Sequence, residues 1–252
     1  GNNLMKGFGV SVSDAFDLMT YGAQNGLNFS NEMFDNLSEY STLFGKMGYS
    51  AQEYFQLLVN GTKAGVYNLD YVNDVMKEFQ IRVKDGSKST NEAMASMSKP
   101  TQKVWQDFLK GKGTVKDVSN TVLKELKGMK DQVDANNIGV ALFGTKWEDL
   151  EADAMYALGG IDGKIGDVKG KADEAGAALQ DNLGTRFKKI GRQALSALEP
   201  LGGAAATMLE KAFNIADPIM KEMSSAGNTV KQAMTGNWGI LQGEGSAERL
   251  EG

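Results

Sequence analysis

The sequence of 252 residues contains no cysteine and no histidine. Thiolate nucleophiles, imidazole general bases, disulfides and nearly all zinc sites need one or the other, so these are excluded. Proline is scarce, with 3 residues against 31 glycines. Helices are therefore rarely interrupted by proline, but each interior glycine costs up to about 1 kcal/mol relative to alanine. We expect helices that depend on partners for their stability.

Long apolar runs and a clear basic excess are also missing. No run approaches the roughly 18 apolar residues of a membrane span, and the amino terminus lacks the layout of a signal peptide. The formal net charge of -5 argues against general attraction to nucleic acid or anionic membranes. Lysines do cluster between residues 103 and 130, but Asp107, Asp117 and Glu125 are interleaved with them. This favours a solvated helix face in a soluble protein, with DNA contact as a weak alternative.

One block of sequence recurs at an offset of about 39 residues, which is typical of stacked helical units. FDLMTYGAQNGL at residues 16–27 returns as FQLLVNGTKAGV at residues 55–66, and MFDNLSEY at 33–40 returns as VNDVMKEF at 72–79. A whole helix pair is therefore repeated. Each copy has two glycines, Gly22 with Gly26 and Gly61 with Gly65. We predict that each pair combines a close-packed position with a helix terminator and sets a hairpin turn.

Helix starts are marked by a serine or threonine three residues before an acidic residue. In such a capping box the hydroxyl and the carboxylate each accept a hydrogen bond from a free backbone amide. Apolar residues at helical spacing predict buried faces, and Pro100 is predicted to end the helix before it. The predicted boxes are Ser50 with Glu53, Ser89 with Glu92, Thr114 with Asp117, and Thr145 with Glu148. The predicted stripes are Met33, Leu37, Tyr40, Phe44 and Met47, and Leu69, Val72, Met76, Phe79 and Val83.

The dipeptide Gly159-Gly160 is the clearest change of composition in the chain. We predict a helical-hairpin module over residues 1–158, an amphipathic, coiled-coil-like helical arm over 159–235 and a flexible tail over 236–252. Apolar residues after the dipeptide alternate in steps of four and three, the heptad spacing through which identical chains associate. This predicted association seam consists of Ile161, Ile165, Val168, Ala172, Ala175 and Leu179.

Sites for chemistry are weak in this sequence. Gly139 to Lys146 looks like a phosphate-binding loop, but Thr145 precedes Lys146, whereas that loop needs lysine first. Glu148 and Asp149 are expected on a solvated first helical turn, which acidic side chains stabilise. We therefore predict no catalytic, cofactor-binding or metal residue and no enzymatic activity.

Several long phrases, in order, carry a family resemblance. They are the repeated block, KEFQIRVKDGSKST at residues 77–90, GVALFGTKWEDL at 139–150, and the run from 170 to 201. Together they resemble the tail tape-measure proteins of long-tailed bacteriophages and prophages over most of residues 10–215. Since Gly1 is not an initiator methionine, we expect an internal segment of a longer chain.

The resemblance implies a helical protein in the lumen of the virion tail that sets tail length, organises tail-tube assembly and leaves ahead of the DNA. It implies contact with the tail-tube protein and a tail assembly chaperone, and a stage in the host cytoplasm during assembly. The predicted seam adds homo-oligomers along the tail axis. It supplies no catalytic residues. Two alternatives remain: a helical module that binds the chaperone or tube subunits, and a membrane-active segment at residues 194–223 during DNA entry.

Overall fold

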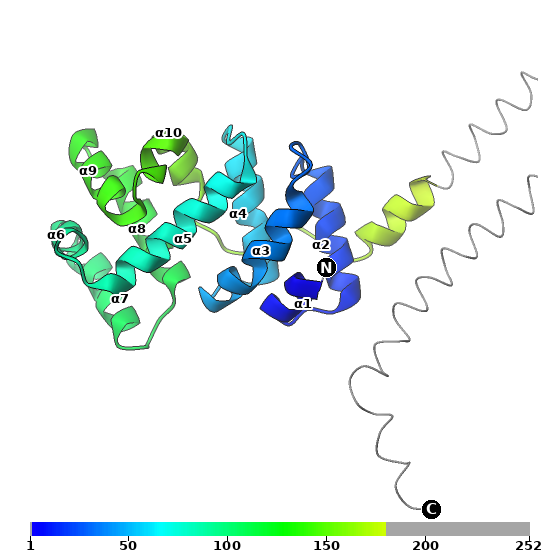
Figure 1. Cartoon of the computed structure of the whole chain (residues 1–252), viewed down its shortest axis with the longest axis horizontal. Coiled ribbons are helices and arrows are strands. Elements are labelled where there is room, and N and C mark those ends of the chain that lie inside the picture. Colours follow the sequence, from blue (N-terminus) through cyan, green and yellow to red (C-terminus); the bar gives the residue numbers. More distant parts are fainter. Residues whose placement is uncertain (1, 180–252) are drawn as a thin grey trace, which may run out of the picture. The chain divides into compact units, whose positions relative to one another are not determined.

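The computed structural model describes residues 2–179. Regular secondary structure in this range consists of helices, with no strand (Figure 1). This confirms the predicted all-α class. None of the helices in this range is both long and apolar enough to cross a membrane. The helices are α1 (Asn2–Phe8), α2 (Val12–Gln24), α3 (Met33–Lys46), α4 (Ala51–Lys63), α5 (Leu69–Asp85), α6 (Lys88–Ser96), α7 (Lys99–Leu109), α8 (Val115–Gly128), α9 (Gln132–Phe143) and α10 (Lys146–Ala157).

The repeated sequence block corresponds to two stacked helix pairs, α2 with α3 and α4 with α5. Both pairs open with a complete capping box, formed by Ser11 and Asp14 before α2 and by Ser50 and Glu53 before α4. Since these two boxes occupy equivalent places in the repeat, the two copies begin in the same register. The Ser50 box was predicted, whereas the Ser11 box is an addition.

The core lies where the predicted stripes of α3 and α5 face each other and the helices around them. All ten stripe residues are buried, including Phe44, Val72 and Phe79 with no exposed surface. A second group of large side chains, centred on Phe143 and Trp147, fills the space beside α5, α9 and α10. The phenyl rings of Phe79 and Phe143 stack with centroids 4.4 Å apart, so the two groups form one continuous core.

Three predicted helix boundaries were wrong, each because of a neighbouring backbone feature. Gly86 ends α5 with φ of 64°, so α6 begins at Lys88 and is capped by the Ser87 hydroxyl, not by Ser89. Thr145 itself has helical dihedral angles and caps nothing with its side chain, although Thr114 does form the predicted box. Pro100 lies in the first turn of α7 rather than after a helix, where its missing N–H costs no hydrogen bond.

The predicted helical arm does not begin at residue 161. Residues 159–170, called the strap below, are non-helical, and helical backbone resumes over 171–179. Gly160, Gly163, Gly166 and Gly170 have positive φ values, which interrupt a right-handed helix. The compact unit formed by α1 to α10 extends to Glu174, past the predicted junction at 158 and 159, and a second unit begins at Ala175. Residues 180–235 of the predicted arm and the predicted tail at 236–252 lie outside the described residues.

Candidate functional site

The second glycine of each repeat lies immediately after a helix. Gly26 and Gly65 have φ of 86° and 94° and follow the ends of α2 and α4. The amide of Leu27 donates to the Gly22 carbonyl over 2.9 Å, and the amide of Val66 donates to the Gly61 carbonyl over 3.1 Å. In each case the left-handed glycine directly precedes the donor residue, and the bond closes the carboxyl end of the helix. Helices α2 and α4 therefore end by the same backbone geometry.

The first glycine of each repeat lies inside a helix at a close contact. A Cβ atom added to Gly22 would lie 2.9 Å from the ring of Phe55, and one added to Gly61 would lie 2.8 Å from Val72 and 3.3 Å from Leu158. Real Cβ atoms rarely approach so closely. Gly22 therefore accommodates the phenyl ring of the following repeat, whereas Gly61 accommodates Val72 of α5 and Leu158, which follows α10.

The terminator glycines lead to a stability prediction. Gly65→Ala should lower the free energy of unfolding by about 1–2 kcal/mol, because alanine is disfavoured at positive φ. Gly65→Asn should lose less, since asparagine tolerates this conformation. Urea denaturation would measure both. The control is Gly128→Ala at the end of α8, where no atom lies within 4 Å of an added Cβ; equal losses at the two positions would contradict the explanation.

A buried polar chain joins three helices of the repeat stack. The Tyr54 hydroxyl donates to Asn73 Oδ1 over 2.9 Å, and Asn73 Nδ2 donates to Asn36 Oδ1 over 2.5 Å. Asn36 in turn donates to the backbone carbonyl of Glu32, so its amide nitrogen is also paired. Burial raises the pKa of Tyr54 well above its ordinary value, which keeps the hydroxyl protonated as the donor. The chain fixes the relative rotation of α3, α4 and α5.

A second connection holds α8 against the start of α4. Lys116 Nζ lies 2.9 Å from a carboxylate oxygen of Glu53, and the Lys116 amide donates to the Met47 carbonyl over 3.0 Å. Burial alone would raise the pKa of Glu53, but the Ser50 amide and Lys116 outweigh it and lower the pKa. The buried hydroxyls of Tyr49 and Ser119, 3.0 Å apart, add a further link. Glu53 thus caps α4 and pairs with α8 at once.

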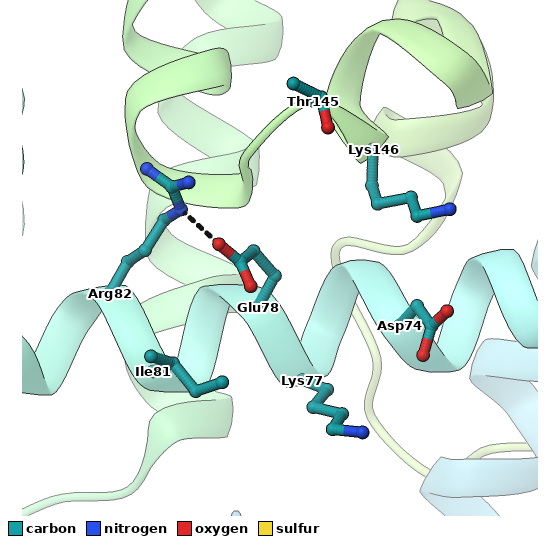
Figure 2. A pocket seen from close by; sticks show the side chains of 7 residues that line it. All are labelled: Asp74, Lys77, Glu78, Ile81, Arg82, Thr145 and Lys146. Atoms are coloured by element: carbon teal, nitrogen blue, oxygen red, sulfur yellow. Dashed lines mark hydrogen bonds and ion pairs between the residues drawn. The ribbon is translucent and has the colours of Figure 1, made fainter.

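A shallow polar groove of about 320 Å³ runs between α5 and the connection from α9 to α10 (Figure 2). Arg82 Nε lies 2.7 Å from Glu78 Oε1, and Arg82 Nη1 donates to the Ala141 carbonyl over 3.2 Å in the last turn of α9. A guanidinium is favourable there because the carboxyl end of a helix carries partial negative charge. The groove is lined by Asp74, Lys77, Glu78, Ile81, Arg82, Thr145 and Lys146.

The charged groups that line this groove already have partners in the protein. Lys146 Nζ lies over the Tyr71 ring at 4.3 Å, and Asp74 accepts a hydrogen bond of 2.9 Å from the Tyr40 hydroxyl. Burial, and then Asp74, raise the pKa of Tyr40 above its ordinary value, so Tyr40 stays protonated. Among the side chains that line this groove, no nucleophile is hydrogen-bonded to a general base. Its polar contacts attach the α9–α10 connection to α5.

The strap crosses the module and is bound to it by side chains from three helices. Gln56 Oε1 on α4 accepts hydrogen bonds from the amides of Asp162 and Gly163, at 3.1 and 2.7 Å. Asn120 on α8 donates to the Ile161 carbonyl over 3.3 Å. At the far end of the strap, the carboxylate of Asp17 on α2 accepts from the amides of Gly170 and Ala172, both at 2.9 Å.

Asp17 binds the end of the strap, a role that the sequence did not predict. Its side chain is on α2, is 3% exposed and caps the helical backbone that starts at residue 171. Carboxylates stabilise the amino-terminal end of a helix through its free amides and its dipole. Because the capping residue is separated from that helix by more than 150 positions, the local pattern of sequence contains no sign of it.

The six residues of the predicted seam do not lie along one helix face in the described structure. Ile161 is 5% exposed within the core, and Ile165 and Val168 pack against the core from the strap. Ala172 and Ala175 are half-buried on the resumed helix, and Leu179 is 62% exposed. The first three are thus divided from the last three by the end of the strap.

The described residues contain no cluster of three acidic, histidine or cysteine side chains placed to hold a metal ion. Gly144, Thr145 and Lys146 connect α9 to α10, and an added Cβ at Gly144 would lie 2.8 Å from Glu78. The absence of a side chain at Gly144 thus allows the α9–α10 connection to pass close to α5. The residues identified so far lie at turns, close helix contacts and inter-helix links of an all-helical fold.

Comparison with known proteins identifies the family. The sequence profile of the family "Phage-related minor tail protein" matches residues 2–144, and the chain belongs to that family. It is also 30% identical over 238 residues to a "Probable tape measure protein" of Streptomyces phage phiC31. That match covers 93% of this chain and 32% of the relative, so the chain spans about a third of the relative's length. No solved structure matches the chain.

Proposed function

We propose that this chain is a non-enzymatic segment of a tape measure that sets tail length, templates assembly of the tail tube and is ejected during genome delivery. The observation that carries the proposal is the similarity to a probable tape measure protein over 93% of the chain, combined with an all-helical build. A helix rises by about 1.5 Å per residue, so the length of a helical chain fixes a physical distance.

The location and partners proposed for it follow from that function. The tape measure would occupy the virion tail lumen after a stage in the host cytoplasm, and would contact the tail-tube protein and a tail assembly chaperone. Copies would associate along the tail axis. Contact with DNA would be weak, because the chain has a formal net charge of -5.

In-frame deletions of matched size test the length-setting role. Removing residues 12–50 deletes one repeat and joins Ser11 to Ala51, which preserves a serine three residues before Glu53 and hence a capping box. Removing residues 180–218 deletes the same length of the predicted arm. The arm deletion should shorten tails by roughly 60 Å, at about 1.5 Å per residue. The repeat deletion should match it if the module opens in the tail, and should shorten tails less if the module stays folded.

Tail length would be measured by electron microscopy of purified virions. The control is Val133→Ala, which alters an exposed side chain without changing chain length. Tails of unchanged length after both deletions would contradict the proposed function.

A second function, as a helical module that binds a tail chaperone or tube subunits, is favoured by one side chain. Phe16 on α2 is the repeat equivalent of Phe55 on α4, but Phe16 is 47% exposed whereas Phe55 is fully buried against Gly22. The outer face of α2 therefore presents a phenyl ring in the position that the repeat uses for helix packing. The alternative of membrane activity falls on residues 194–223, outside the described residues.

A further inference from the structure

The residues after α10 cannot form a continuous helical stripe and remain docked on the module at the same time. Their apolar side chains recur at heptad spacing from Ile161 to Leu179, and this spacing forms one continuous stripe only on a helix. In the structure the first part of this pattern belongs to the strap, with Ile161 buried in the module and the amide of Gly170 bound to Asp17. The seam can therefore be complete only when the strap has left the module.

The contacts that hold the strap can be exchanged for water. Gln56, Asn120 and Asp17 bind it through backbone hydrogen bonds, and Gln56 Nε2 also donates to Asp162 Oδ1 over 3.1 Å. Ile161 is the strap's buried apolar anchor, while Ile165 and Val168 are only partly buried. Such a segment detaches more readily than a core helix, because few of its apolar groups are buried.

The glycines of the strap make a released strap dependent on a partner for helical structure. Gly160, Gly163, Gly166 and Gly170 permit the docked conformation through their positive φ values. In a helix the same residues lower the intrinsic propensity, so an isolated helix through this segment would be weak. A partner that buries its apolar stripe would stabilise it. A second copy of the chain offers the same stripe and the same spacing.

We propose that the docked strap is an autoinhibitory cover for self-association. While it is bound, Ile161, Ile165 and Val168 are held on the module, apart from Ala172, Ala175 and Leu179 on the resumed helix. Release lets them join Ala172, Ala175 and Leu179 on one helical stripe, which pairs with the same stripe of a second copy. This inference rests on the proposed tape-measure function, in which copies associate along the tail axis.

Two variants of the full chain shift the equilibrium in opposite directions. The release variant Asp17→Ala/Gln56→Ala removes three amide hydrogen bonds to the strap and a fourth to Ala172, at the start of the resumed helix. Its matched control is Gln52→Ala/Asp35→Ala, which alters an exposed glutamine of α4 and an exposed aspartate of α3. The locked variant Gln56→Cys/Asp162→Cys replaces two side chains in direct contact, in a chain that otherwise contains no cysteine.

Sedimentation equilibrium and far-ultraviolet circular dichroism would be measured together. The release variant should self-associate at a concentration about tenfold below that of the wild type and gain helix as it does so. The oxidised locked variant should stay monomeric where the wild type associates, and reduction should restore association. If the pair does not oxidise, a short bifunctional thiol reagent would join the two cysteines instead, because the contact between Gln56 Nε2 and Asp162 Oδ1 lies at the ends of longer side chains.

Leu179→Asp in the release background identifies the surface that associates. This exposed residue lies on the resumed helix, outside the strap, and its change should return the release variant to the monomer. Association that persists with Leu179→Asp, or release and locked variants that associate like the wild type, would overturn the inference. The deletion experiment on tail length is independent of these measurements, so each proposal can fail alone.

Discussion

Replacing Trp147 by alanine is expected to lower the free energy of unfolding by about 3–5 kcal/mol, the usual cost of removing a buried aromatic side chain. The indole is 1% exposed and lies against the rings of Phe143 and Tyr156, with centroids 5.5 and 5.8 Å away. Its Nε1–H donates to Asn136 Oδ1 over 2.8 Å. Its removal leaves a cavity between α9 and α10.

Chemical denaturation would measure this loss, with Trp147→Phe and Val133→Ala as comparisons. Trp147→Phe keeps a ring in the core and should cost less than alanine. Val133 lies on α9 but is 69% exposed, so its replacement should change stability by no more than about 0.5 kcal/mol. A loss below about 1 kcal/mol for Trp147→Ala would show that the indole is not packed between these helices.

Gly45→Val is expected to release α1 from α3 and to lower the free energy of unfolding by about 3 kcal/mol, the upper range for overpacking. The two helices cross at Gly7 and Gly45, where an added Cβ on Gly45 would overlap the Gly7 carbonyl. An added Cβ on Gly7 would lie 2.7 Å from the Ser41 carbonyl group. Backbone atoms on both sides cannot rotate away, so the helices must separate and expose Leu4, which is fully buried here.

Hydrogen exchange at the amides of α1 would report the separation directly. Gly128→Val serves as the control, because an added Cβ at Gly128 meets no atom within 4 Å. Deleting residues 1–9 should lower the free energy of unfolding of the wild type. The same deletion in Gly45→Val should lower it several times less, because α1 is already detached in that variant. Full protection of α1 in Gly45→Val would contradict the crossing.

The sequence predicted the helical class and the repeat because both depend on local, periodic features. The stripe from Leu69 to Val83 identifies one face of α5 whatever surrounds it, and Ser50 with Glu53 satisfies amides of its own helix. Thr145 with Glu148 has the same pattern but fails, because Gly144 ends α9 so close by that Thr145 is already helical. A capping box therefore predicts a start only where the preceding backbone leaves room for an extended residue.

The strap and the residues that bind it were not predictable from spacing alone. Ile161, Ile165 and Val168 satisfy helical periodicity, while Gly163 and Gly170, both with positive φ, are bound by residues from a distant part of the chain. The density of glycine between residues 159 and 170 was the feature that argued against a helix. Asn73 and Asp17 were overlooked because a buried polar residue is recognisable only once its partner is known.

The order of the strap's attachments has a mechanical consequence. They follow one another along the chain, with Asn120 and Gln56 near residues 161–163 and Asp17 at residues 170 and 172. A tensile force applied through the helix that resumes at residue 171 would load the Asp17 bonds first and those of Gln56 only after the first had broken. Bonds loaded in sequence peel apart at lower force than bonds sheared together. Under tension the chain would therefore lengthen by a defined segment before any core helix is disturbed.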